Sequence, residues 1–264
     1  MTRDTEHALS FGRAVGDYEL GRPGYPTEAI DWIRGELGEL AAGHPDDRLA
    51  RAAGSTTRTL VDVGAGTGKF TASLLGHGAR VVAVEPDAAM RETLAAKLTE
   101  VVTLAGTGEE LPLDDASADL VTFAQAWHWV DVPAASAEVA RVLKPGGLLA
   151  LVWNIRDESV DWVARLTGII EPSAAEQYDS RTPKVAAPLA PTAHSEFTWE
   201  NPLNREQLLA MVTSRSYIIA LQPHERANVV RLVERLLDEH PDLASLTTYP
   251  MPYVTRVTLA RVTP

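Results

Sequence analysis

The 264-residue chain contains no cysteine. This absence excludes a fold held by disulfides, a thiolate nucleophile and a zinc site with cysteine ligands. The seven histidines are scattered along the sequence, so we expect no metal site. Aromatic residues make up 6% of the chain. A cluster of them in one motif is therefore informative.

Basic residues are scarce beside acidic ones, and the formal net charge is −12. A surface of this sign repels phosphate backbones, so we expect no nucleic acid among the partners. No apolar run reaches the roughly 20 residues that span a bilayer, and residues 1–7 lack the apolar core of a signal peptide. We therefore expect a cytoplasmic protein, a monomer or homodimer, with no membrane partner.

A glycine-rich turn follows the short β-branched run at residues 60–63. The turn contains Gly64, Gly66 and Gly68, and an apolar-patterned segment begins at Phe70. This order predicts a strand, a tight turn and a helix. Glycines let the backbone bend sharply and approach a ligand closely, and the free amides at a helix N-terminus favour an anionic group.

A second apolar run, residues 80–84, ends at Glu85. In a doubly wound fold, an acid at the tip of the second strand faces the ribose of a nucleoside that lies across the first loop. The sequence therefore predicts a nucleoside pocket that includes Gly64, Gly66 and Glu85. The alternative is that Glu85 is a solvated loop acid.

Two other nucleotide-binding motifs fit this loop poorly. The dinucleotide fingerprint needs a third glycine where Lys69 stands, which argues against a nicotinamide or flavin dinucleotide. A Walker A loop needs a glycine in place of Val63 and a serine or threonine in place of Phe70. What remains is Asp-x-Gly-x-Gly-x-Gly with an acid at the end of the second strand.

That combination resembles the motif of class I S-adenosylmethionine-dependent methyltransferases, in particular the type 11, trans-aconitate methyltransferase-like subgroup that acts on small molecules. The resemblance implies a doubly wound, Rossmann-like α/β fold, with a seven-stranded, mostly parallel sheet and one antiparallel strand. It also implies one domain over residues 1–264. We expect within it a cover segment (1–40), a flexible insertion (41–57), a cofactor-binding core (58–154) and a C-terminal part with a substrate flap, helices and the last strands (155–264).

The same resemblance implies S-adenosylmethionine as cofactor and S-adenosylhomocysteine as product. Residues 18–26 are similar to a Tyr-x-x-x-Arg-Pro-x-Tyr-Pro entry that folds over the cofactor in this subgroup, although a surface strap is the alternative. Residues 106–113 resemble the loop that flanks adenine, with Gly108 in place of the usual alanine. The predicted cofactor-binding residues are Tyr18, Arg22, Asp62, Gly64, Ala65, Gly66, Gly68, Glu85, Pro86, Met90, Gly108, Glu109, Gln125 and Ala126.

The aromatic cluster Trp127-His128-Trp129 follows the fourth predicted strand, at the end where ligands bind. In the methyltransferase fold this tip lies beside the reactive methyl. We predict His128 as the catalytic residue, either as a general base or as a donor to an acceptor carboxylate. The alternative is a histidine packed between tryptophans. The predicted substrate-binding residues are Trp127, His128, Trp129, Trp153, Asn154 and Arg156.

Together these patterns predict an enzyme that transfers a methyl group from S-adenosylmethionine to a small-molecule acceptor. Arginine, histidine and tryptophan side chains suit a carboxylate or hydroxyl oxygen on a partly apolar metabolite. The alternative is a protein of the same fold that binds the cofactor without methylating, or that catalyses another reaction.

Overall fold

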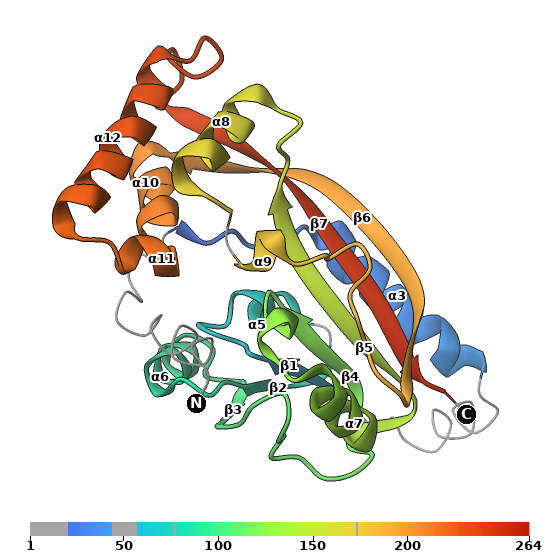
Figure 1. Cartoon of the computed structure of the whole chain (residues 1–264). Helices are drawn as coiled ribbons and strands as arrows, with labels where there is room; N and C mark the ends of the chain where they lie inside the picture. Colours follow the sequence, from blue (N-terminus) through green and yellow to red (C-terminus); the bar gives the residue numbers. More distant parts are fainter. Residues whose placement is uncertain (1–20, 44–56, 77, 173, 264) are drawn as a thin grey trace. The chain divides into compact units, whose positions relative to one another are not determined.

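A computed structural model of the chain describes residues 21–43, 57–76, 78–172 and 174–263 (Figure 1). The chain divides into two compact units. The larger unit comprises Tyr25–Trp153, Asp179–Phe197 and Thr255–Pro264, and the smaller unit comprises Met1–Gly24, Asn154–Tyr178 and Thr198–Val254. The single domain that the sequence predicts stays a prediction. Tyr18 and residues 44–56 of the predicted insertion lie outside the described residues.

The described residues form a seven-stranded sheet with the order β3-β2-β1-β4-β5-β7-β6. β1 pairs in parallel with both β2 and β4, β2 pairs in parallel with β3, and β4 with β5. The predicted doubly wound, mostly parallel seven-stranded sheet is confirmed. The strands are β1 (Thr59–Val63), β2 (Arg80–Val84), β3 (Val102–Leu104), β4 (Ala118–Ala124), β5 (Leu143–Arg156), β6 (Leu189–Asn204) and β7 (Thr248–Val262).

Two helices of the larger unit begin at a residue whose side chain caps the helix. Asp87 accepts a hydrogen bond from the Met90 amide (2.9 Å) at the start of α6, and Asp131 accepts one from the Ala134 amide (3.0 Å) at the start of α7. The helices of this unit are α3 (Thr27–Gly43), α5 (Lys69–Ser73), α6 (Ala88–Lys97), the 3₁₀ turn η2 (Trp127–Trp129) and α7 (Val132–Val142).

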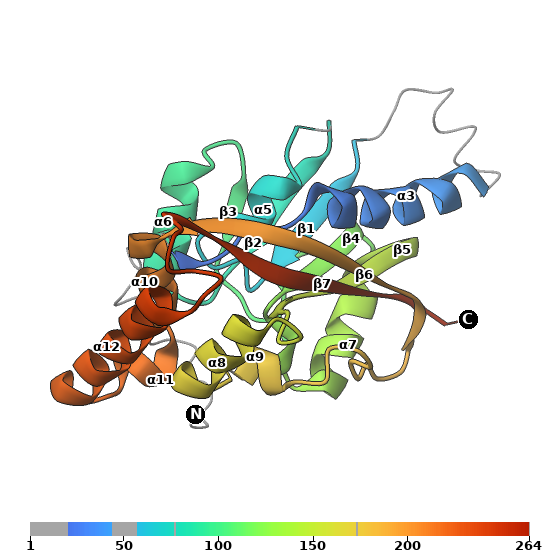
Figure 2. The ribbon, with the colours of Figure 1, turned by 90° about the horizontal axis from the view of Figure 1, so that it is seen from above.

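The smaller unit is mostly helical. α8 and α12 contact each other and lie side by side in both views (Figures 1 and 2). Their buried faces, with Leu166 and Ile170 on α8 and Val233 and Leu237 on α12, belong to one apolar cluster. The helices of this unit are α8 (Asp161–Ile170), α9 (Ala174–Gln177), α10 (Arg205–Thr213), α11 (Ser216–Ile219) and α12 (Pro223–Glu239). No helix in the described ranges combines the length and the apolar character needed to cross a membrane.

The extent of α3 corrects one prediction. The flexible insertion was expected to begin at residue 41, but α3 continues to Gly43. Leucine, glutamate and alanine have high helix propensity, and residues 39–42 contain no other residue type. These residues therefore extend the helix by another turn.

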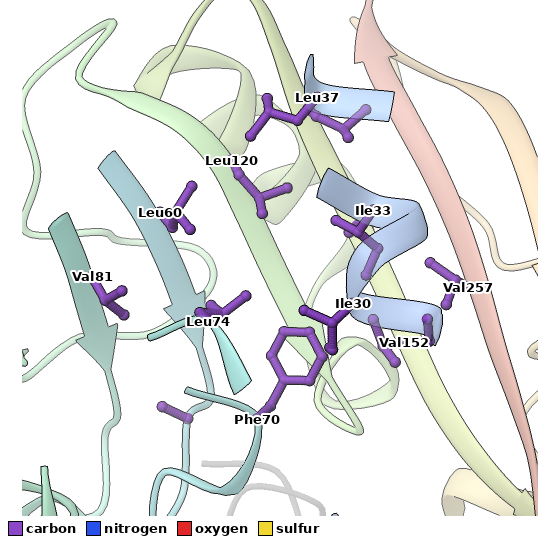
Figure 3. Close-up of a cluster of buried hydrophobic side chains, with 14 of the residues drawn as sticks. Ile30, Ile33, Leu37, Leu60, Phe70, Leu74, Val81, Leu120, Val152 and Val257 are labelled. Carbon is purple, nitrogen blue, oxygen red and sulfur yellow. The ribbon is translucent and has the colours of Figure 1, made fainter. Parts of the chain in front are cut away.

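The core of the larger unit lies between α3 and the sheet (Figure 3). Ile30, Ile33 and Leu37 recur at helical spacing on α3, and each is at most 7% exposed. They pack with strand residues such as Leu120 and with Phe70 of α5 in one cluster of buried side chains. This packing fixes α3 and the short helix α5 against the strands that lead to the glycine-rich loop.

The strand order reverses next to β1. The chain runs outward from β1 through β2 to β3 and then returns to β4, on the other side of β1. In open α/β sheets, ligands bind where such a reversal separates two neighbouring strands, at their carboxyl ends. For this chain, that position lies after Val63 and Ala124.

Candidate functional site

The loop after β1 has a backbone that favours glycine. Gly64, Gly66 and Gly68 have positive φ angles of 66°, 57° and 88°, in the left-handed region that side chains with a Cβ rarely adopt. A Cβ on Gly64 would also lie 2.6 Å from the Cβ of Ala126. The tips of β1 and β4 therefore meet at Gly64 and Ala126, which were both predicted as cofactor-binding residues.

Glu85 connects this loop with the end of β2. Its carboxylate oxygens accept hydrogen bonds from the backbone amides of Gly66 (2.8 Å) and Asp87 (2.8 Å). Glu85 is 6% exposed, so it is not a solvated loop acid. Burial raises the pKa of its carboxyl group, and the two amide donors act in the opposite direction. Because a carboxylate can accept about four hydrogen bonds, Glu85 retains the capacity to bind hydroxyl groups.

Asp62 lies one residue before the end of β1 and supports the loop from within the protein. It is 1% exposed, and it accepts hydrogen bonds from the hydroxyls of Thr71 (2.6 Å) and Thr122 (2.9 Å). It thus joins α5 to β4. The pKa of Asp62 is raised to about 6, chiefly by burial and to a smaller extent by the nearby charge of Glu85, while the two threonine hydrogen bonds act in the opposite direction. Its predicted contact with a cofactor stays a prediction, because both side-chain contacts observed are with protein.

Close contacts in the loop after β3 explain why position 108 is a glycine. A Cβ on Gly108 would lie 2.9 Å from the Phe123 ring and 2.9 Å from Val130. Glu109 accepts a hydrogen bond from the Asp131 amide (2.8 Å), which ties the loop to the start of α7. Met90 is 4% exposed on α6, a position that also suits core packing.

The chain turns sharply after β4, at Gln125. This residue has a φ of 58°, a strained value for a residue with a side chain, and its amide donates to the Val152 carbonyl (2.8 Å) of β5. Strain of this kind persists only where the surrounding structure holds it, and it concentrates at functional sites. The turn brings Ala126 against Gly64 and starts η2.

The three aromatic residues of η2 differ in exposure. Trp127 is fully buried; its ring meets Phe123 edge-on at 4.8 Å, and its indole N–H donates to the Lys184 carbonyl (2.8 Å). His128 and Trp129 are half-buried, with ring centroids 4.7 Å apart. The structure thus shows a packing role for Trp127, while His128 and Trp129 reach the surface. An acceptor contact stays a prediction for all three.

The other predicted site residues are divided between the units. Trp153 is fully buried in the larger unit. In the smaller unit, the Asn154 side-chain amide donates to the Gly24 carbonyl (2.8 Å), and Arg156 forms an ion pair with Glu176 (3.0 Å). Arg22 belongs to the smaller unit as well. The larger unit thus brings together the predicted residues on β1, β2, β4 and the loop after β3.

Sequence reasoning missed the residues that support the site. Thr71 and Thr122 hold Asp62, and Thr122 was detectable as the polar residue within the run 120–124, in register with Asp62. Glu176 and Arg215, which join Arg156 in a buried cluster, had no local signal. Their proximity depends on how separate helices pack.

The raised pKa of Asp62 predicts how stability depends on pH. Because the folded-state pKa of about 6 lies above the unfolded value of 3.8, the folded protein keeps a proton that the unfolded chain releases. The contribution of Asp62 to the free energy of unfolding therefore falls by about 3 kcal/mol as the pH rises from about 4 to above 6. Asp62→Asn lacks this titrating group, so its free energy of unfolding should rise relative to that of the wild type as the pH rises from about 4 to above 6.

Urea unfolding of both proteins at pH 4, 5.5 and 7 measures this difference. Asp114→Asn, the same substitution at an exposed turn residue, controls for the general loss of a carboxylate. Parallel stability curves for Asp62→Asn and wild type would contradict the assignment.

Comparison with known proteins supports one conclusion about family. Residues 61–151 match a family model described as methyltransferase domain. An uncharacterized methyltransferase of Mycobacterium tuberculosis (strain ATCC 25618 / H37Rv) is 45% identical over 256 residues, which cover 96% of this chain and 97% of the relative. A malonyl-[acyl-carrier protein] O-methyltransferase of Serratia marcescens is 29% identical over 147 residues, 54% of this chain and 50% of that protein.

A solved structure resembles the whole fold. The structure of a proposed type II methyltransferase from Anaeromyxobacter dehalogenans has a TM-score of 0.65 and 22% identity, and the match covers 91% of this chain and 97% of that one. At this identity the likeness concerns the fold. The family model and the mycobacterial relative carry the further conclusion that the chain belongs to the methyltransferase family.

Proposed function

We propose that this methyltransferase transfers a methyl group from S-adenosylmethionine to an oxygen, of a carboxylate or hydroxyl, on a small-molecule acceptor. The observation that carries the proposal is the joint between the glycine-rich loop and Glu85. A buried carboxylate holds the loop after β1 through the Gly66 amide and still has free acceptor capacity. That is the combination that a nucleoside with two vicinal hydroxyls requires.

The residues present fit this cofactor. The loop after β1 carries no Cβ at Gly64, Gly66 or Gly68, so a ligand can approach its backbone closely. In the proposal, this loop faces the methionine part, Glu85 holds the ribose, and Gly108 with Glu109 frames the adenine. Gln125 and Ala126 border the reacting end. When bound, the sulfonium group supplies an electrophilic methyl carbon.

The chain's own part in the reaction is then mainly to position the acceptor. A displacement needs the acceptor oxygen about 3 Å from the methyl carbon with its lone pair aligned. His128 reaches the surface beside Trp129. It can take a proton from an acceptor hydroxyl or donate one to an acceptor carboxylate. Trp129 offers a flat apolar wall that excludes water from one side.

Two observations support a small acceptor with a reactive oxygen. The formal charge of −12 disfavours nucleic acid as substrate. The relative from Serratia marcescens is an O-methyltransferase, and its likeness extends over about half of this chain. We take from it the oxygen as methyl acceptor, and not the carrier protein.

A screen for transfer tests the proposal directly. The purified chain is incubated with S-adenosylmethionine and a panel of carboxylic acids, alcohols and phenols, and products are detected by mass. The expected result is a product that has gained CH₂, with an equal amount of S-adenosylhomocysteine. Binding of S-adenosylhomocysteine without CH₂ gain in any acid, alcohol or phenol would favour the alternative of a non-methylating binding protein.

Replacing Glu85 tests the ribose contact. Glu85→Ala should weaken the binding of S-adenosylhomocysteine by about 10- to 100-fold in calorimetry, because hydrogen bonds to a charged group contribute about 1.5–3 kcal/mol. Glu92→Ala removes an exposed carboxylate from α6 and is the matched control. Circular dichroism shows whether each variant is folded. Unchanged affinity in folded Glu85→Ala would refute the assignment.

Replacing His128 separates catalysis from binding. If His128 transfers a proton, His128→Ala should lower kcat by about 10²-fold or more, while the affinity for S-adenosylhomocysteine changes by less than about threefold. Single-turnover kinetics and calorimetry measure the two effects. His224→Ala, at an exposed histidine of α12, is the control. Wild-type turnover in His128→Ala would leave His128 with a packing role.

A further inference from the structure

Arg91 occupies an unfavourable position for a basic residue. It is the fourth residue of α6, near the N-terminus of the helix, where the helix dipole carries partial positive charge. Basic residues are favoured at the opposite end, where Lys97 stands. Residues that break a local rule of this kind are expected at functional or strained sites. The position of Arg91 therefore points to a contact outside the helix.

The guanidinium group of Arg91 reaches the loop that precedes α6. Side chains of a helix lean toward its N-terminus, and Arg91 Nη1 donates hydrogen bonds to the backbone carbonyls of Glu85 (2.8 Å) and Pro86 (3.2 Å). Both carbonyls lie beyond the end of β2 at Val84. A backbone carbonyl past the end of a strand needs a donor from elsewhere, and Arg91 supplies it.

Glu85 is thus held at each of its polar groups. Its amide donates to the Leu104 carbonyl of β3 (3.1 Å), and its carbonyl accepts from Arg91. Its carboxylate accepts from the amides of Gly66 and Asp87, both at 2.8 Å. Because the carbonyl and the side chain share one Cα atom, a donor that fixes the carbonyl also fixes the direction of the carboxylate.

The charge of Arg91 acts on the same carboxylate. Burial is the largest influence on the pKa of Glu85 and raises it, and the amide hydrogen bonds from Asp87 and Gly66 lower it. The charge of Asp87 raises this pKa, and the charge of Arg91 lowers it. Asp62 of β1 is a further acid within electrostatic range of Glu85. Among these groups Arg91 carries the positive charge, so it favours the ionised carboxylate, which accepts hydrogen bonds from hydroxyl groups at both oxygens.

The same helix also contacts the loop after β1. Lys97 Nζ donates to the Thr67 carbonyl (3.3 Å). A Cβ on Gly68 would lie 2.9 Å from Leu94 and 2.9 Å from Leu98, so the loop packs closely on α6 and its C-terminal end. α6 therefore contacts both loops of the predicted nucleoside pocket, and all of these contacts lie within the larger unit.

We propose that Arg91 is a positioning residue for the nucleoside, which holds Glu85 in the orientation that binds the ribose hydroxyls. Its own hydrogen bonds go to the backbone, so it acts through Glu85. This inference rests on the proposed function, in which Glu85 is the ribose ligand. It extends that function by naming the side chain through which α6 affects cofactor affinity. Loss of Arg91 should then weaken nucleoside binding only while Glu85 is present.

Calorimetry with S-adenosylhomocysteine tests this dependence in a double-mutant cycle. Arg91→Met keeps an unbranched apolar stem and removes the donor and the charge, so it should weaken binding by about 5- to 10-fold. In the Glu85→Ala background the same substitution should weaken binding by less than about twofold. A purely structural role in α6 predicts the same loss in both backgrounds. Equal losses would therefore overturn the proposal.

Two further variants separate the contact from a general loss of charge. Arg91→Lys restores a positively charged donor and should recover part of the affinity, to within about threefold of the wild type. Arg80→Met removes an exposed arginine from the other end of β2 and should bind as the wild type does. Circular dichroism shows whether each variant is folded, and Arg91→Gln replaces Arg91→Met in the cycle if the latter does not fold. Binding by Arg91→Lys that is no tighter than binding by Arg91→Met would count against the assignment and overturn it.

Amide hydrogen exchange of the ligand-free protein gives an independent readout. The Gly66 amide donates to the Glu85 carboxylate, so its exchange should be at least about threefold faster in Arg91→Met than in the wild type. The amide of Val61, within β1, should keep its rate. Faster exchange confined to the amides of α6 would indicate a structural role and overturn the proposal.

Failure of this inference is distinguishable from failure of the proposed function. A wild-type chain that does not bind S-adenosylhomocysteine would overturn the proposed cofactor site and, with it, the role of Arg91. Binding by the wild type together with equal losses in the two backgrounds would overturn the role of Arg91 alone.

Discussion

The hydrogen bond from the Gly66 amide to the Glu85 carboxylate joins the tips of two adjacent parallel strands. The described site of the larger unit is arranged around this contact. It requires a backbone turn with positive φ after β1 and a buried acid at the end of β2. The close approach of Gly64 to Ala126 then brings the end of β4 to the same place. The ends of β1, β2 and β4 therefore meet where the strand order reverses, which is where ligands bind in sheets of this kind.

Two buried carboxylates stabilise this arrangement through hydrogen bonds. Asp62 and Glu85 lie near enough for the charge of Glu85 to raise the pKa of Asp62, and burial raises both pKa values. Each acid is held by protein donors, Asp62 by two threonine hydroxyls and Glu85 by two backbone amides. Hydrogen bonds to buried polar groups make a region rigid. The loop is therefore preorganised at the expense of stability near neutral pH.

The two units differ in the sign of their buried charge. The larger unit buries the acids Asp62 and Glu85 beside its glycine-rich loop, and the smaller unit buries Arg156 and Arg215 around Glu176. In the proposed function, Glu85 serves the nucleoside, and Asp62 supports the loop from within the protein.

The sequence by itself determined the sheet, the glycine-rich loop and the acid at the second strand tip, because these features depend on local rules of strand alternation, backbone freedom at glycine and turn formation. It did not determine the full length of α3, because the predicted insertion began at residue 41, whereas the helix propensity of residues 39–42 extends the helix to Gly43. Only the tertiary structure decided that Trp127 is buried against Phe123, and that Arg156, Glu176 and Arg215 share one buried place. Arg156, Glu176 and Arg215 lie far apart in the chain, and the packing of separate elements brings them together. Phe123 and Trp127 are close in the chain, but their contact depends on the sharp turn at Gln125.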